Sequence, residues 1–132
     1  MRILVLGGTG YVAGELLRLI AGHPNLNLAG ILSDSQPGES VAKAFGHLLS
    51  AYPDTVFSSI EQIEQLVATL PRSAIFSAAP HGASAALIDR LLAKAEAAGT
   101  KPSVVDISAD YRFATNAAYA AVYKHDHGAQ NR

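Results

Sequence analysis

A glycine-rich segment follows a short apolar stretch near the start of the chain. Ile3 to Leu6 are all apolar, Gly7 and Gly10 come next, and Ala13 and Gly14 follow. A dinucleotide pyrophosphate needs a tight turn, a close backbone approach and a helix N-terminus that points at it. Gly7 can supply the turn, Gly10 the approach, and Ala13 or Gly14 a small contact between helix and strand. The G-x-x-G-x-x-A spacing predicts dinucleotide binding, although a glycine turn without a ligand is the alternative.

The residues that would choose the coenzyme lie about 20 positions beyond this turn. The sequence there is Ser33-Asp34-Ser35. A carboxylate binds the ribose hydroxyls of NAD and repels the additional phosphate of NADP, so Asp34 favours NAD. The hydroxyls of Ser33 and Ser35 can donate hydrogen bonds to that phosphate. The residues alone therefore leave the two coenzymes open.

Two further polar segments follow apolar runs. Pro80-His81-Gly82 can form a loop that touches cofactor or substrate, or an ordinary helix start with a solvated histidine. The second segment runs from Asp106 to Arg112 and includes Ser108 and Asp110. Arg112 can pair with a carboxylate or phosphate through its planar guanidinium, oriented by Asp110. Spacing alone favours the alternative, a local salt bridge that closes a loop.

Other kinds of site have little support. His125-Asp126-His127 lacks a third ligand at zinc-like spacing, so we expect a solvated tail and no metal site. The 132 residues contain no cysteine, which excludes disulfides, thiolate metal sites and cysteine nucleophiles within them. Neither a Ser-His-Asp arrangement nor a phosphate-binding P-loop can be singled out. We identify no catalytic residue in this chain.

Strands and helices are predicted to alternate and so to bring these segments together. Apolar runs predict strands at 3–6, 26–32, 74–78 and 103–107, and helical periodicity predicts helices at 11–21, 60–70 and 83–98. Between them we expect a loop at 33–40, a short helix at 41–50 and a strand at 55–57. Alternation of this kind predicts an α/β fold, a Rossmann-like, doubly wound, mostly parallel sheet with helices on both faces.

The amino-acid composition limits the kinds of partner that this chain is expected to bind. Ten basic and eleven acidic residues leave a net charge of -1, which offers no electrostatic footprint for nucleic acid or an anionic membrane. No apolar run reaches the roughly 20 residues of a membrane-spanning helix. We therefore expect a soluble, cytoplasmic protein. We expect a dinucleotide-binding domain at residues 1–113 and a tail at 114–132 leading toward a catalytic domain that this chain lacks.

Together these segments resemble the N-acetyl-gamma-glutamyl-phosphate reductases, which are related to aspartate-semialdehyde dehydrogenases. The matching pieces are Gly7 to Tyr11 with Glu15 to Arg18, then His23-Pro24, Pro80-His81-Gly82, and Asp106 to Arg112. They occur in the family's order across nearly the whole chain. The last two are more particular to this reductase than the glycine turn.

The resemblance implies an NADP-binding Rossmann domain followed by a second domain for catalysis and oligomer contacts. In that family a cysteine attacks a small acyl phosphate, NADPH reduces the thioester and a histidine assists, as a step in arginine biosynthesis. The family's cysteine and histidine lie beyond the matched segment. We therefore expect this chain to bind nucleotide without turning over substrate, and the full-length enzyme to form a homo-oligomer.

The resemblance also implies where the parts of the ligands lie. The turn that contains Gly7, Thr9, Gly10, Tyr11 and Ala13 would hold the pyrophosphate. The remaining sites are the adenosine ribose at Ser33 and Ser35, the nicotinamide side at Pro80, His81 and Gly82, and the substrate's phosphate or carboxylate at Ser108 and Arg112. Asp34 stands where the family commonly has a basic residue. Two alternatives stay open, a semialdehyde dehydrogenase with another substrate and a standalone dinucleotide-sensing module.

Overall fold

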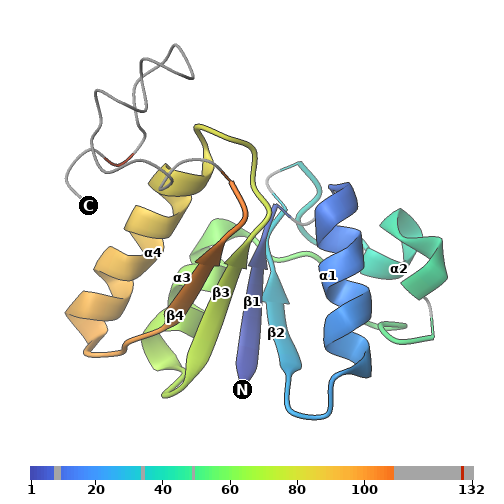
Figure 1. The fold of residues 1–132 in the computed structure, drawn as a ribbon, viewed down its shortest axis with the longest axis horizontal. Coiled ribbons are helices and arrows are strands. Elements are labelled where there is room, and N and C mark those ends of the chain that lie inside the picture. The colour runs from blue at the N-terminus through green and yellow to red at the C-terminus, as the bar shows by residue number, and fades with distance from the viewer. Residues whose placement is uncertain (8–9, 34, 49, 109–128, 130–132) are drawn as a thin grey trace.

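The centre of the protein is a parallel sheet. The computed structural model describes residues 1–7, 10–33, 35–48, 50–108 and 129. Its strands are β1 (Arg2–Leu6), β2 (Asn27–Ile31), β3 (Ser73–Ser77) and β4 (Ser103–Asp106), in the order β2-β1-β3-β4 with every pairing parallel (Figure 1). β2 lies on one side of β1 and β3 lies on the other, so the strand order reverses between β1 and β3. Open α/β sheets bind their ligands at such a topological switch point.

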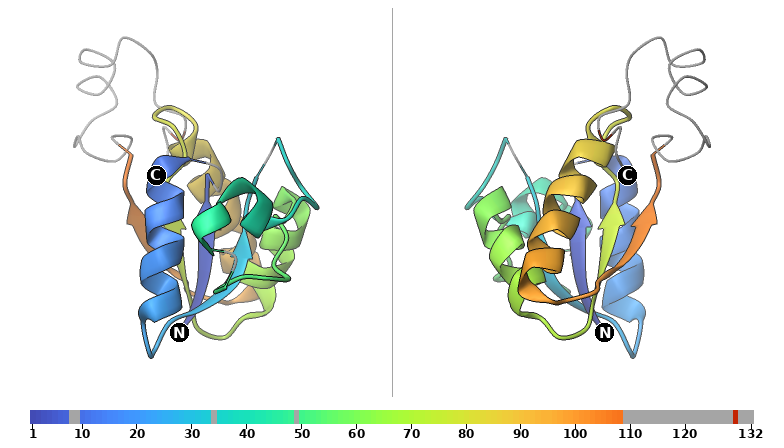
Figure 2. Two further views of the ribbon diagram at one scale, coloured as in Figure 1. Left: turned by 90° about the vertical axis from the view of Figure 1, so that its right-hand side faces the viewer. Right: turned by 90° about the vertical axis from the view of Figure 1, so that its left-hand side faces the viewer.

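Helices cover both faces of the sheet. α1 (Tyr11–Gly22) lies on one face, and α3 (Ile60–Thr69) and α4 (Ser84–Ala98) lie on the other (Figure 2). The predicted doubly wound α/β architecture is therefore confirmed. None of the helices in the described part of the chain is long and apolar enough to cross a bilayer.

β1 shows why the sheet needs both layers. Ile3 and Val5 are fully buried against the α1 side, where Leu17 packs, while Leu4 and Leu6 are fully buried against the α3 and α4 side. A strand covered on both faces reads as one continuous apolar run, as residues 3–6 do. This buried strand fixes the position of the glycine turn that follows it.

Local signals set the helix ends. Ser59 caps α3 with a full capping box, in which the Gln62 amide donates to Ser59 Oγ at 3.3 Å and Gln62 Oε1 accepts from the Ser59 amide at 2.8 Å. Gly99 ends α4 with φ +79°, a conformation that glycine adopts without strain. Both ends were predicted.

The segment between β2 and α3 differs from the prediction in two ways. The expected helix at 41–50 is divided into α2 (Val41–Ala44) and a 3₁₀ turn, η1 (Gly46–Leu48), because the backbone leaves helical geometry at Phe45. The expected strand at 55–57 is wrong. In the described residues only isolated bridges form there, an antiparallel one between Ser40 and Val56 and a parallel one between Leu32 and Ser58, so this segment pairs with two different partners and builds no continuous ladder with either. The predicted domain boundary at residue 113 lies outside the described residues and stays a prediction.

Candidate dinucleotide site

The turn after β1 is held against the end of β3. Gly7 has φ +77°, and a Cβ placed on it would lie 2.7 Å from the carbonyl carbon of Ala78. Any side chain there would both strain the backbone and strike β3's continuation. The Gly7 carbonyl accepts a hydrogen bond from the Gly10 amide at 3.3 Å, which closes the turn.

α1 begins where the turn ends. Gly10 is its N-cap and no side chain caps it, so the amides of the first turn are not satisfied by the helix itself. Among the described residues, a Cβ on Gly10 would meet only the Gly7 carbonyl oxygen, at 3.7 Å. The first-turn amides, which no side chain caps, and the dipole of this helix end suit a pyrophosphate.

The next residues of α1 have different surroundings. Ala13 is fully buried in the core, and a Cβ on Gly14 would lie 3.0 Å from Phe45 Cε1. Small residues at these positions let α1 approach β1 and Phe45. Tyr11 points outward with 87% of its surface exposed, and Thr9 lies outside the described residues.

Two cavities flank the glycine turn at the carboxyl edge of the sheet. The β2-side cavity has about 300 Å³ and the β4-side cavity about 360 Å³. The β2-side cavity is lined by Gly7, Gly10, Leu32, Ser33, Ser35, Ala78, Ala79, Pro80, Ala83 and Leu87. The β4-side cavity is lined by Val12, Ala78, Ala79, Pro80, His81, Ile107 and Ser108.

The two cavities share the segment that follows β3. Ala78, Ala79 and Pro80 line both, so the two cavities adjoin each other, and together they follow a path along the sheet edge from β2 across the switch point to β4. An elongated ligand with a charged centre fits this path, because the uncapped α1 end lies at its middle. The structure thus brings Gly7, Gly10, Ser33, Ser35, Pro80, His81 and Ser108 to one edge.

Ser33 and Ser35 meet in the β2-side cavity. Ser33 is buried, its Oγ accepts a hydrogen bond from the Gln36 amide at 3.0 Å, and it lies 3.5 Å from Ser35 Oγ. The Ser33 hydroxyl therefore organises the loop after β2 as well as lining the cavity. Asp34 lies outside the described residues, so its choice between coenzymes stays a prediction.

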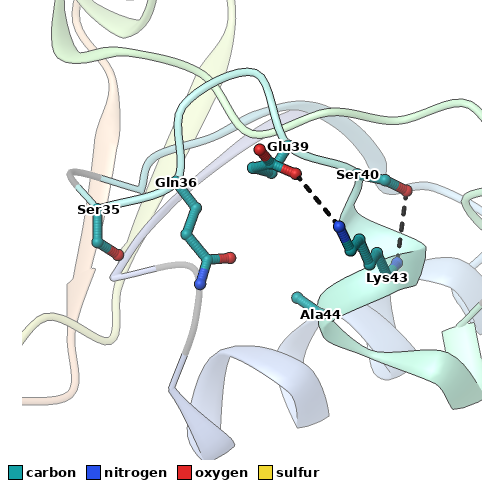
Figure 3. A pocket seen from close by; sticks show the side chains of 6 residues that line it. All are labelled: Ser35, Gln36, Glu39, Ser40, Lys43 and Ala44. Atoms are coloured by element: carbon teal, nitrogen blue, oxygen red, sulfur yellow. Dashed lines mark hydrogen bonds and ion pairs between the residues drawn. The ribbon is translucent and has the colours of Figure 1, made fainter.

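A third cavity, which we term the Lys43 cavity, adjoins the first at Ser35. It has about 520 Å³ and is lined by Ser35, Gln36, Glu39, Ser40, Lys43 and Ala44 (Figure 3). Lys43 Nζ lies 3.9 Å from Glu39 Oε2, and both side chains are mostly exposed. Such an exposed pair contributes about 0–1 kcal/mol, so an anionic ligand can replace Glu39 as the partner of Lys43.

A buried polar network lies behind the β4-side cavity, and the sequence analysis did not identify it. Ser77 and Ser84 are fully buried with their Oγ atoms 2.6 Å apart, and Ser84 donates to Asp106 Oδ1 at 2.8 Å. Asp106 also accepts from Ser108, from its amide at 3.0 Å and from its hydroxyl at 2.9 Å. Asp106 was visible in the motif, but the two serines come from separate elements and carry no spacing signal.

The remaining predicted residues divide into placed and unplaced ones. His81 lines the β4-side cavity, whereas Gly82, with φ +86°, lines neither of the two. Arg112 and the histidines at 125 and 127 lie outside the described residues. Within the described part of the chain, no three acidic or histidine side chains gather as a metal site.

The glycine turn, the uncapped helix and the paired cavities agree with the comparison to known families. Residues 2–127 match the family model described as "Semialdehyde dehydrogenase, NAD binding domain". The chain belongs to this family. The cofactor class is therefore a nicotinamide dinucleotide, and the resemblance drawn from the sequence is confirmed.

Individual relatives agree with one another. The N-acetyl-gamma-glutamyl-phosphate reductases of Pseudomonas putida strain W619 and Ectopseudomonas mendocina strain ymp are each 40% identical to this chain, over 129 and 130 residues. The reductase of Pseudomonas aeruginosa strain UCBPP-PA14 is 39% identical over 129 residues. Each comparison covers 98% of this chain and 35% of the relative, so the chain spans about a third of the length of these relatives.

Proposed function

We propose that this chain is the cofactor-binding part of an NADP-dependent reductase that converts N-acetyl-glutamyl phosphate to its semialdehyde in arginine biosynthesis. The observation that carries the proposal is the path of two cavities across the Gly7 turn, joined to the reductase name of relatives matched over 98% of the chain. The same names favour this substrate over that of a different semialdehyde dehydrogenase.

The ligand would lie with its adenosine half toward β2. Gly7, Gly10 and the first-turn amides of α1 would hold the pyrophosphate, and Ser33 and Ser35 the adenosine ribose. Pro80 and His81 would lie on the nicotinamide side, at the β4-side cavity. The bound coenzyme supplies a hydride. The chain's own residues bind it, orient it and line one side of its nicotinamide with apolar groups.

NADP is the coenzyme that we propose. Ser35 lines both the β2-side cavity and the Lys43 cavity, so a phosphate on the ribose 2′ oxygen would extend from the first into the second. There the Ser35 hydroxyl, the side-chain amide of Gln36 and the Lys43 ammonium can all donate hydrogen bonds to the phosphate. Glu39 opposes the phosphate, but its contact with Lys43 is long and exposed.

The other partners follow from the same proposal. Arg112 would bind the phosphate or carboxylate of the acyl phosphate through its guanidinium. We also propose a cytoplasmic location and a homo-oligomer for the full-length reductase. These last two points are supported by the resemblance.

Calorimetric titration of the purified chain with NADPH and NADH tests the proposal. We expect tighter binding of NADPH, and we expect Ser33→Ala and Ser35→Ala to weaken NADPH more than NADH. Ser50→Ala, an exposed serine outside the three cavities, is the matched control. A folded chain that binds neither coenzyme would overturn the proposed function, and preference for NADH would overturn the choice of NADP.

A further inference from the structure

The ends of three elements meet at a buried pair of hydroxyls and a carboxylate. Ser77 is the last residue of β3, Ser84 the first of α4 and Asp106 the last of β4. Ser84 donates to Asp106 Oδ1 at 2.8 Å, and its hydroxyl has only one proton, so Ser77 is the donor in the 2.6 Å contact between the two serines. Both serines are fully buried, so water does not compete for these bonds. The start of α4 is therefore fastened to the ends of β3 and β4.

The same carboxylate holds the segment that leaves β4. The Ser108 amide donates to Asp106 Oδ1 at 3.0 Å, and the Ser108 hydroxyl donates to Oδ2 at 2.9 Å. Between them, the Ile107 amide donates to the Ser77 carbonyl at 3.0 Å. Asp106 thus accepts three hydrogen bonds from two segments that are distant in sequence. A carboxylate can accept all three because it has two oxygens and no proton of its own.

Both of these segments border the β4-side cavity. Pro80 and His81 line it just before α4, and the Pro80 carbonyl accepts from the amide of the first α4 residue at 3.1 Å. Ile107 and Ser108 line the same cavity after β4. Asp106 itself is not one of the lining residues. It therefore connects two parts of the cavity wall from behind.

We propose that Asp106 is a positioning residue for the nicotinamide half of the coenzyme, because it fixes the His81 segment relative to the Ser108 segment before the ligand binds. The inference rests on the proposed function, since it requires the nicotinamide in the β4-side cavity. A cavity wall that is already ordered loses less conformational freedom on binding, so the affinity for this half is higher. In this role Asp106 contacts neither coenzyme nor substrate.

Two ligands separate the halves of the coenzyme. NADPH would reach the β4-side cavity, whereas adenosine 2′,5′-bisphosphate lacks nicotinamide and would stay on the β2 side. The ratio of their affinities, measured by calorimetry, reports the contribution of the nicotinamide half. We expect Asp106→Ala to weaken NADPH by about 3- to 10-fold, the effect of ordering about one more side chain, and to leave the bisphosphate unchanged. Unchanged binding of the bisphosphate also shows that the variant folds.

Asp106→Asn distinguishes positioning from a direct effect of the charge. The oxygen of the asparagine side chain can still accept from the Ser84 hydroxyl and the Ser108 amide, the two bonds that join α4 to the segment after β4. We therefore expect an affinity ratio close to that of the wild type. If the negative charge itself acted on the nicotinamide, Asp106→Asn would lose as much as Asp106→Ala, and that result would overturn the positioning role.

Thr100→Val is the matched control for a lost tie between elements. Thr100 Oγ1 donates to the Val67 carbonyl at 2.8 Å, which joins the far end of α4 to α3, and Thr100 lines none of the three cavities. We expect this variant to unfold more easily than the wild type but to keep the wild-type affinity ratio. An equal fall of the ratio in Thr100→Val and Asp106→Ala would show general loosening of the domain and overturn the inference.

Ser84→Ala provides a second route to the same answer. It removes the link between α4 and Asp106 and leaves the contacts of Asp106 with Ser108 in place, so it should also weaken NADPH more than the bisphosphate, even if Asp106→Ala does not fold. If both ligands bind and Ser84→Ala keeps the wild-type ratio, the positioning role is wrong and the proposed function stands. If neither ligand binds the folded wild-type chain, the proposed function itself is wrong.

Discussion

Two separate features of the structure require glycine at position 7. Its φ of +77° disfavours any L residue, and a Cβ there would lie 2.7 Å from Ala78 backbone atoms. Left-handed geometry alone costs about 1–2 kcal/mol. We expect Gly7→Ala to lower the free energy of unfolding by more than that, because the turn must also move away from β3.

Gly38 provides the matched control for that substitution. It has φ +84°, and a Cβ there would have no atom of the described residues within 4 Å. Gly38→Ala should therefore show only the cost of the backbone conformation, about 1 kcal/mol. Urea unfolding of both variants measures the difference, and equal losses would show that the close approach to β3 does not constrain the turn.

Tyr52 ties the segment after η1 to α1. Its buried hydroxyl donates to the Leu17 carbonyl at 2.7 Å, and burial raises the pKa of the phenol above its ordinary value of 10.0. The folded state therefore favours the protonated phenol. Its contribution is fully present below pH 10 and is lost as pH rises through the higher pKa of the folded state.

Tyr52→Phe should separate the two effects. Below pH 10 we expect the variant to unfold about 1 kcal/mol more easily, since one hydrogen bond is missing. Above pH 10 wild type should lose stability more steeply than the variant, which has no phenol at 52 to titrate. Denaturant unfolding at a series of pH values measures both slopes, and parallel curves would contradict the buried-phenol argument.

The Lys43 cavity predicts opposite effects from its two charges. Lys43→Gln should weaken NADPH by about 3- to 10-fold and leave NADH nearly unchanged, since only NADPH brings a phosphate there. Glu39→Gln should strengthen NADPH because it removes a like charge. Calorimetry at low and high salt checks this, and both effects should shrink as salt rises. Equal changes for both coenzymes would place the phosphate elsewhere.

At the scale of elements, one ion pair joins α3 to α4. Glu64 is nearly buried, with Oε1 2.7 Å from Arg90 Nη2 and Oε2 3.9 Å from Lys94 Nζ. Removing its charge leaves two cations on α4 without that partner. We expect Glu64→Gln to destabilise the chain by about 1–2 kcal/mol.

The pair of Glu15 and Arg18 is a suitable comparison. Their contact is 3.0 Å, but both side chains are about half exposed and lie within α1. Glu15→Gln should change the free energy of unfolding by less than about 0.5 kcal/mol. If thermal and denaturant unfolding gave equal losses for the two substitutions, burial between helices would not explain the importance of Glu64.

The elements that the sequence predicted correctly carry their own signals. The apolar run at 3–6 and the capping box at Ser59 each determine structure within a few residues, so strand and helix could be assigned without knowing the fold. The segment at 55–57 had apolar residues, but its one bridge joins Val56 to Ser40, which is distant in sequence, and no ladder extends from that bridge in the described residues. At 55–57, contacts with distant segments and not the local sequence determined the backbone structure.

The residues of the candidate site also fall into those that the sequence could predict and those that it could not. The turn at Gly7 and the serines after β2 could be predicted because a strand, a turn and a helix are consecutive in sequence. The order from Ser77 through Ser84 to Asp106 could not, because it joins β3, α4 and β4, and hydroxyl direction follows only from their distances. Ser108 was predicted as a site residue, but its hydrogen-bonding role needed the structure.

At the scale of the whole molecule, the two cavities let one ligand span the sheet edge. Adenosine 2′,5′-bisphosphate should occupy only the β2 side, whereas NADPH should reach both sides. The amides of Ile107 and Ser108 lie on the β4 side, bonded to Ser77 and Asp106. We expect NADPH to slow their hydrogen exchange and the bisphosphate to leave it unchanged, at concentrations that saturate each ligand.

The loop after β2 is the internal reference for this measurement. The amides of Gln36 and Gly38 bond to Ser33 Oγ and the Phe57 carbonyl. Both ligands should slow exchange at these two amides, since both carry the adenosine half. Equal protection of the β4 side by the bisphosphate would mean that binding stiffens the whole domain, because opening of any part would then cost the same mass-action stabilisation. If NADPH slows exchange on both sides and the bisphosphate slows it only at Gln36 and Gly38, each cavity binds its own half of the coenzyme.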